Sequence, residues 1–254
     1  MALQTPPFYV DWTFWAAAMA LVAIVLSQIP PLRVILRPKR LEVDVHSRIR
    51  ITHAVGNPNA SILVGLRNTG GRQLRVQSMA LDISRDGKPI SNLPSNQYFE
   101  MPSSTSTVLF VPFNINPGDA WTHSVTFLNE NDRLTEKALR KNVSELQTDI
   151  RIKLQARPTD QKNTLVEAEV ALVTPFYALM DERFVWFPGE YVAELSVLTQ
   201  PGSASFKKKY RFTLFESDTE DLRAHKDDYK YGGGIAYNVD THAGSNIPLT
   251  LLKD

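Results

Sequence analysis

Residues 41–52, LEVDVHSRIRIT, alternate apolar and polar side chains with a period of two. Leu41, Val43 and Val45 fall on one side, and acidic or polar residues fall on the other. This period is typical of a half-buried β-strand, because successive strand side chains point to opposite faces of a sheet. The pattern predicts that the chain after residue 40 enters a sheet with one covered face.

Similar short runs recur along the chain and are separated by turn residues. Asp86-Gly87 is the usual pair for a tight hairpin, and Pro117-Gly118 occupies the central positions of a type II turn. A slip in the apolar phase near Gln77-Ser78 predicts a β-bulge. About ten short strands against two modest helices favour a mainly β chain folded as an antiparallel sandwich.

Three of these pieces together resemble an immunoglobulin-like sandwich of the bacterial cell-surface or CARDB/fibronectin-III kind. They are the strand ending in Arg67-Asn68-Thr69-Gly70, the Pro117-Gly118-Asp119 turn with its following strand, and the Pro188-Gly189-Glu190-Tyr191 turn with its following strand. The resemblance implies that residues 41–216 form one sandwich domain, with an α/β insertion at residues 129–186.

The insertion contains a change of period. Leu139, Val143 and Leu146 lie at helical spacing, after a capping residue at Asn131 or Asp132. Alternation then resumes at residues 150–155 and 166–172, which predicts a hairpin around the polar turn at residues 157–163. The alternative is two small sandwiches that meet near this turn.

Residues 12–29, WTFWAAAMALVAIVLSQI, form the longest apolar run and follow a short tail at residues 1–11. At about 1.5 Å per residue the run measures about 27 Å, which predicts a transmembrane helix. Trp12 and Trp15 suit the headgroup level of a bilayer. The alternatives are a buried core helix and a cleaved signal peptide, although residues 1–30 contain no Lys or Arg for a signal peptide's basic region.

A basic, proline-containing linker follows at residues 30–40, with the cations Arg33, Arg37, Lys39 and Arg40. Excess Lys and Arg beside a span marks its cytoplasmic side. We therefore expect a single-pass protein of the cell membrane, with its N-terminus outside and its C-terminal domain in the cytoplasm. Trp12, Trp15 and the four cations are the predicted membrane-anchor residues, and the lipid bilayer is a predicted partner.

The composition excludes several classes of site. The formal net charge is +1, so no broad basic field suggests nucleic-acid binding. The chain has no cysteine, which excludes disulfides, thiolate catalysis and thiolate metal ligands. The five histidines show no metal-binding spacing, and no phosphate-binding loop or nucleophile elbow occurs. We predict no catalytic residue, no metal and no cofactor.

One segment has the composition of a partner-binding surface. Aromatic residues, Met and Arg are enriched at protein interfaces. The segment offers the residues Phe176, Tyr177, Met180, Arg183, Phe184 and Trp186. The alternative is that these side chains fill the core. Residues 217–254 are expected to form a short helix and a tail that is either loose or docked along the domain.

These features favour a non-enzymatic binding or scaffolding module that acts through a protein partner, or through self-association, at the cytoplasmic membrane face. The alternative is an outward-facing envelope protein that binds carbohydrate or a surface polymer through aromatic residues of the sandwich. A third possibility is an enzyme with a site assembled from scattered strand and loop residues. The fold class does not decide among them, because sandwiches host many functions.

Overall fold

The computed structural model describes residues 12–28, 38–101, 104, 106–158, 164–237 and 244–252. The strands are β1 (Leu41–Ala54), β2 (Asn57–Asn68), β3 (Leu74–Arg85), β4 (Lys88–Phe99), β5 (Thr107–Leu109), β6 (Phe113–Ile115), β7 (Ala120–Leu128), β8 (Gly189–Gln200), β9 (Phe206–Leu214), β10 (Ser245–Pro248) and β11 (Thr250–Leu251). The helices are α1 (Trp12–Gln28), α3 (Arg133–Ala156), α4 (Val170–Arg183) and α5 (Glu216–Ala224), with 3₁₀ segments η3 (Gly202–Ala204) and η4 (His225–Tyr231).

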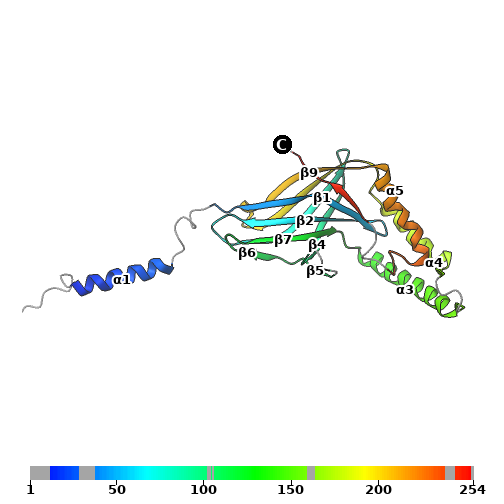
Figure 1. Cartoon of the computed structure of the whole chain (residues 1–254), viewed down its shortest axis with the longest axis horizontal. Coiled ribbons are helices and arrows are strands. Elements are labelled where there is room, and N and C mark those ends of the chain that lie inside the picture. The colour runs from blue at the N-terminus through cyan, green and yellow to red at the C-terminus, as the bar shows by residue number, and fades with distance from the viewer. Residues whose placement is uncertain are drawn as a thin grey trace, which may run out of the picture.

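All of these strands belong to one antiparallel sheet (Figure 1). Along the sheet the order is β10-β1-β2-β7-β4-β3-β8-β9-β11, with β5 added to β4 and β6 added to β3. The hairpin turn at Asp86-Gly87 and the bulge between Val76 and Ser78 are confirmed. Both glycine and aspartate of that turn have positive φ, as a tight hairpin turn requires.

Strand β4 joins the two halves of the sheet. Its first part pairs with β3 as far as Pro94, opposite Ala80, and its last part pairs with β7 from Ser95 onward. A bulge at Asn96 accompanies the change of partner. The Met79 N–H donates to the Ser95 hydroxyl at 3.3 Å, so a side chain satisfies a β3 amide at the point where β4 departs.

The C-terminal segment brings the two ends of the sheet together. β10 pairs with β1, and β11 pairs with β9 after the single residue Leu249. Leu249 donates its N–H to the Ser47 carbonyl oxygen at 2.8 Å, and Leu252 donates to the Lys209 carbonyl oxygen at 3.0 Å. Ile247 and Leu249 are buried in the core. The tail is therefore docked over residues 244–252, and the β domain extends well beyond residue 216.

The nearly closed sheet corrects the predicted immunoglobulin-like sandwich. A sandwich has two separate sheets, whereas here β4 connects both halves and the C-terminal segment bridges the remaining gap. Alternating side chains from both halves still meet in one core, as the sequence period indicated. The core includes Ile49, Ile62, Val64, Leu81, Phe127, Leu195 and Phe212.

The N-terminal helix also differs from the prediction. α1 covers 17 residues and lies apart from the sheet, with its apolar side chains exposed (Figure 1). Among the described residues, no helix combines the length and the apolar character that a membrane crossing requires. The predicted transmembrane helix at residues 12–29 is corrected accordingly. The predicted cytoplasmic orientation depended on that span and loses its basis.

The insertion contains two long helices instead of one helix and a hairpin. α3 continues through the predicted strand at residues 150–155, because Ile150 extends the buried helical face of Leu146 by one turn. The second predicted strand, residues 166–172, is irregular as far as Glu169, and α4 begins within it at Val170. We call α3, α4, α5 and η4 the helical arm, which lies at one end of the sheet (Figure 1).

The turn between β1 and β2 holds the helical arm on the sheet. Gly56 has φ +84°, and a Cβ there would lie 2.8 Å from the Met180 carbonyl oxygen of α4. The buried His53 donates from Nε2 to the Leu222 carbonyl oxygen of α5 at 2.9 Å, and its Nδ1 accepts the Gly56 N–H at 3.2 Å. This one turn therefore contacts both α4 and α5.

We predict that Gly56→Ala destabilises the protein more than Gly87→Ala. Both glycines occupy hairpin turns at positive φ, which costs an L-residue about 1 kcal/mol. A Cβ at residue 87 meets open space, whereas a Cβ at residue 56 meets α4 backbone. Urea unfolding monitored by circular dichroism measures the difference, and equal losses in the two variants would contradict the close contact.

Candidate functional site

The aromatic segment predicted as a partner-binding surface is brought together by the structure, but mostly in the core. The buried members are Phe176, Met180, Phe184 and Trp186, while Tyr177 and Arg183 are half-buried. Trp186 donates from Nε1 to the Thr52 carbonyl oxygen of β1 at 2.8 Å. These side chains fasten α4 and the following segment to the sheet, so the exposed surface of the helical arm consists of other residues.

Tyr229 occupies the centre of the helical arm. Its ring is fully buried and stacks on Tyr177 with 6.0 Å between the ring centroids. Its hydroxyl lies 3.7 Å from the Met180 sulfur, and burial raises the pKa of this hydroxyl above its ordinary value. Tyr229 is thus a neutral packing residue that joins η4 to α4.

Polar contacts join the start of α3 to the end of α4. The predicted cap at Asp132 is confirmed, since its carboxylate accepts the N–H groups of Leu134 and Thr135 at 2.9 and 3.1 Å. The Thr135 hydroxyl and these N–H groups lower the pKa of that carboxyl. Arg183 donates to the Asn131 side-chain oxygen at 2.5 Å and to the Thr135 hydroxyl at 3.3 Å. Arg183 therefore links the two helices.

A second polar cluster ties the far end of α3 to the segment before α4. The Lys153 ammonium lies 2.8 Å from the Asp149 carboxylate and donates to the Glu167 carbonyl oxygen at 3.1 Å. Asp149 also accepts the Glu169 N–H at 2.9 Å. Burial acts to raise the pKa of the Asp149 carboxyl, but Lys153 and the Glu169 N–H outweigh it and hold the pKa below its usual range.

The Glu167 carboxylate extends this cluster to η4. It lies 2.9 Å from the Lys230 ammonium and accepts from the Tyr231 hydroxyl at 3.0 Å. Both contacts lower the pKa of the Glu167 carboxyl, and hydrogen bonds to Glu167 and Tyr231 raise the pKa of the Lys230 ammonium. The Ala168 N–H donates to the Lys230 carbonyl oxygen at 2.7 Å. The two clusters make the end of the arm a defined surface.

Apolar side chains are exposed at this same end of the helical arm, where α3 ends and α4 begins. Ile152 in the last turns of α3 is 58 % exposed, Leu165 is 70 % exposed, and Val170 in the first turn of α4 is 79 % exposed. We call these three residues the arm patch. The sequence does not mark them, because the alternation at Ile152 and Val170 predicts strands whose apolar face is covered, and Leu165 lies outside any pattern.

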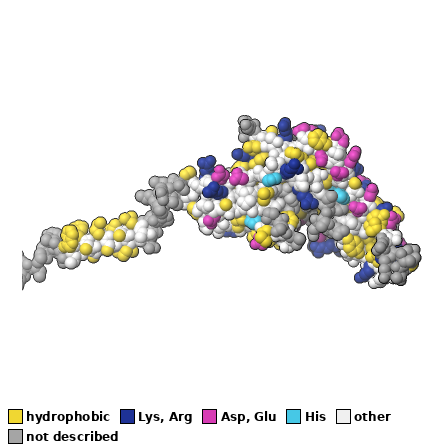
Figure 2. Space-filling model, viewed as in Figure 1, with side chains coloured by type: hydrophobic (Ala, Val, Ile, Leu, Met, Phe, Trp, Pro, Cys, Tyr) yellow, Lys and Arg dark blue, Asp and Glu magenta, His cyan; other side chains and the backbone are white. Residues whose placement is uncertain are grey.

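The helices of the arm differ in charge. α3 contains six basic and three acidic residues, whereas α5 and η4 together contain six acidic and three basic residues. Figure 2 shows acidic side chains gathered toward α5 and basic side chains along the side of α3.

Those predicted membrane-anchor residues that the structure describes are not brought together (Figure 1). Trp12 and Trp15 are exposed on α1, and Lys39 and Arg40 are exposed just before β1. Arg33 and Arg37 lie outside the described residues.

The described residues contain no cluster of three or more His, Asp or Glu side chains that could hold a metal ion. His53 is bonded between the β1–β2 turn and α5, and the half-buried His123 has Nδ1 3.1 Å from the Phe99 carbonyl oxygen. His46 accepts the Arg48 N–H, and His225 lies 3.8 Å from Asp228. His242 lies outside the described residues.

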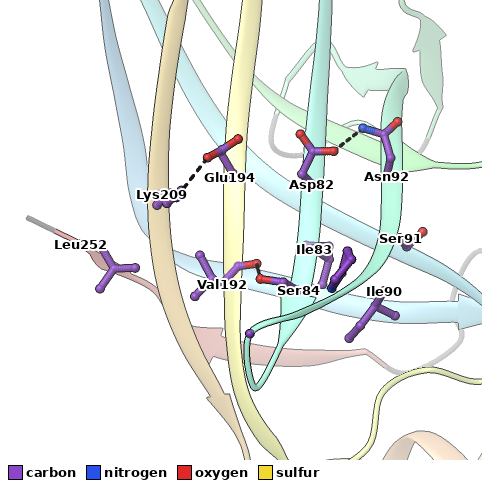
Figure 3. A pocket seen from close by; sticks show the side chains of 12 residues that line it. Asp82, Ile83, Ser84, Ile90, Ser91, Asn92, Val192, Glu194, Lys209 and Leu252 are labelled. Atoms are coloured by element: carbon purple, nitrogen blue, oxygen red, sulfur yellow. Dashed lines mark hydrogen bonds and ion pairs between the residues drawn. The ribbon is translucent and has the colours of Figure 1, made fainter. Parts of the chain in front are cut away.

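The outer face of β4, β3, β8 and β9 carries a shallow groove of about 710 Å³ (Figure 3). Ile90, Val192 and Leu252 supply apolar surface. The polar lining side chains pair across strands: Asn92 donates to Asp82 at 2.5 Å, and Lys209 lies 3.6 Å from Glu194. Because these groups satisfy one another, the groove offers mainly apolar contact.

Two smaller hollows, of about 430 and 400 Å³, lie on the outer face of the other half of the sheet. They share Arg50, Leu63, Phe99 and Ser124, which come from β1, β2, β4 and β7. Cross-strand pairing places Leu63 opposite Ser124 and Ser124 opposite Phe99. This surface mixes hydrogen-bonding groups with apolar ones, as a polar ligand with an apolar part would require.

Comparison with known proteins identifies no family. No family model matches the chain, and no curated protein matches it. A crystal structure of a protein from Archaeoglobus fulgidus aligns at 9 % identity and a TM-score of 0.26, covering 70 % of this chain and 97 % of that one. A candidate lipoprotein from Bacillus subtilis aligns at 9 % identity and a TM-score of 0.26, covering 76 % and 98 %. Similarities this low carry no argument about fold or function.

We predict that Asp149→Asn lowers the free energy of unfolding by about 1–3 kcal/mol at pH 7, because it removes a charged hydrogen-bond partner that is only 16 % exposed. The folded pKa of Asp149 is lowered, so this stabilisation is present above the unfolded value near 3.9 and is lost as pH falls through the folded value. Urea unfolding from pH 7 to pH 2 checks both points.

Glu145→Gln is the matched control, because Glu145 also pairs with a lysine one turn away on α3 but is far more exposed. It is expected to change stability by less than about 0.5 kcal/mol. A gap between wild type and Asp149→Asn that does not narrow as the pH falls from 7 to 2 would contradict the role given to Asp149.

Proposed function

We propose that this protein is a non-catalytic binding module that docks a protein partner on the end of its helical arm. The observation that carries the proposal is the arm patch of Ile152, Leu165 and Val170. These large apolar side chains come from the last turns of α3, the segment before α4 and the first turn of α4. Exposed apolar surface with a polar rim is characteristic of protein–protein contact sites.

The rigidity of the surrounding surface supports the same proposal. Asp149, Lys153 and Glu167 fix the segment before α4 against α3, and Lys230 fixes it against η4. A preformed surface loses less conformational entropy on binding than a loose one. The arm is therefore suited to rigid docking, in which the partner meets side chains already held in place.

The charged flanks favour a partner of particular chemistry. The basic α3 and the acidic α5 with η4 lie on different sides of the arm. Complementary charges steer encounter and set orientation more than they add affinity. The partner is expected to present an apolar side-chain cluster between an acidic margin, which faces α3, and a basic margin, which faces α5.

The test is affinity capture by the full-length protein in a mild nonionic detergent, with bound proteins identified by mass spectrometry. The wild-type bait is compared with a triple variant that carries Ile152→Gln, Leu165→Gln and Val170→Gln together. We expect the triple variant to bind the partner with an affinity at least about tenfold lower, because a tenfold change requires the loss of only about 1.4 kcal/mol of apolar contact. Glutamine is a good helix former and leaves the net charge unchanged.

Leu198→Gln provides the control, because Leu198 is 50 % exposed on β8, away from the arm. This variant is expected to capture the same proteins as wild type in the same amounts. Thermal unfolding of each bait confirms that exposed substitutions leave the fold intact. If the triple variant binds every captured protein as well as the control does, the arm patch is not a docking surface.

A further inference from the structure

The segment from Met101 to Gly118 contains no charged residue, in a chain in which 22 % of residues are charged. Glu100 and Asp119 border it directly. Uncharged, β-prone surface segments are rare on soluble surfaces, because they invite contact with other chains. The segment spans β5 and β6, which extend from the path of the main sheet.

Apolar side chains of this segment are exposed beside β5. Leu109 is 69 % exposed and Val111 is 61 % exposed, whereas Phe110 between them packs on Phe113 with 5.9 Å between the ring centroids. The core side of the segment is therefore filled, and the exposed side carries two large aliphatic residues. Core packing does not account for these two side chains.

The backbone of β5 has a free edge. Within the described residues, β5 pairs with β4 alone. The Phe110 N–H donates to the Asn96 carbonyl oxygen at 2.9 Å, so Phe110 turns its backbone groups toward β4. Antiparallel ladders alternate, and within β5 the N–H and C=O of Thr107 and Leu109 therefore point away from β4. Pro112, which has no N–H, ends this edge.

We infer that the free edge of β5 pairs with β5 of a second copy of this chain. This interface is separate from the arm patch and does not depend on the proposed partner. A copy fits because the segment is neutral, so two identical edges meet without like-charge repulsion. The hydrogen-bonding pattern also matches itself, since an antiparallel two-fold arrangement presents the same donors and acceptors from both sides.

The geometry fixes the register. Leu109 lies at the centre of the free edge, and its outward N–H and C=O pair with those of its symmetry mate. Thr107 of each copy then lies opposite Val111 of the other, and the exposed aliphatic side chains of both copies cover one another. Residues in such a hydrogen-bonded antiparallel pair have Cα atoms about 5.5 Å apart, within the range of a disulfide.

The absence of cysteine makes this register directly testable. Leu109→Cys is introduced into the full-length protein, which is kept in a mild nonionic detergent so that the apolar α1 does not drive association. Mild oxidation is expected to link two chains through residue 109 at least about tenfold faster than in Leu198→Cys, whose similarly exposed thiol meets its mate only by collision. Non-reducing electrophoresis measures the rate.

The second measurement is sedimentation equilibrium of proteins into which no cysteine has been introduced. Wild type and Leu198→Lys are expected to dimerise, and Leu109→Lys with Val111→Lys is expected to weaken the dimer at least about tenfold by placing unpaired charges in it. A wild type that stays monomeric, or a dimer that survives both lysines, overturns the inference. Equal oxidation rates for Leu109→Cys and Leu198→Cys overturn it as well, whatever the helical arm binds.

Discussion

The change of partner along β4 is the constraint on which the rest of the structure depends. Because β4 pairs first with β3 and then with β7, two half-sheets that would otherwise pack as a sandwich form one surface. Pro94 contributes no ladder donor where the strand leaves β3, and the Ser95 hydroxyl satisfies the Met79 N–H that remains. β10 and β11 can then close the opposite side with a single short segment.

The position of both candidate surfaces follows from this arrangement. The closed sheet leaves the β1–β2 turn at one end, where Gly56 and His53 receive α4 and α5 and thereby orient the helical arm. The connection between β4 and β7 contains β5 and β6, and β5 places Leu109 at a free edge. The arm patch and the β5 edge come from different insertions and can be occupied independently.

The sequence predicted local features well, because each depends on neighbouring residues. The Asp86-Gly87 turn, the bulge at Ser78 and the cap at Asp132 belong to this class. The strands that pair with β4 could not be predicted, because the alternation of apolar and polar residues in a strand is the same whichever strand lies beside it. Ile150 and Ile152 fit both a strand and a helix, and burial of Ile150 beside Gly232 within the helical arm accompanies the helix. The aromatic segment was predicted as an exposed binding surface, but most of its side chains are buried. The exposed residues of the arm patch had no distinguishing composition.

A two-dimensional nuclear Overhauser spectrum of the amide protons and α-protons tests the shared strand most directly. We expect contacts between Asp82 and Asn92, where β4 pairs with β3, and between Tyr98 and Val125, where β4 pairs with β7. Both sets must appear with comparable intensity in the same folded species. A spectrum in which β4 contacts only one of these neighbours would contradict the continuous sheet and would restore a sandwich of two separate sheets.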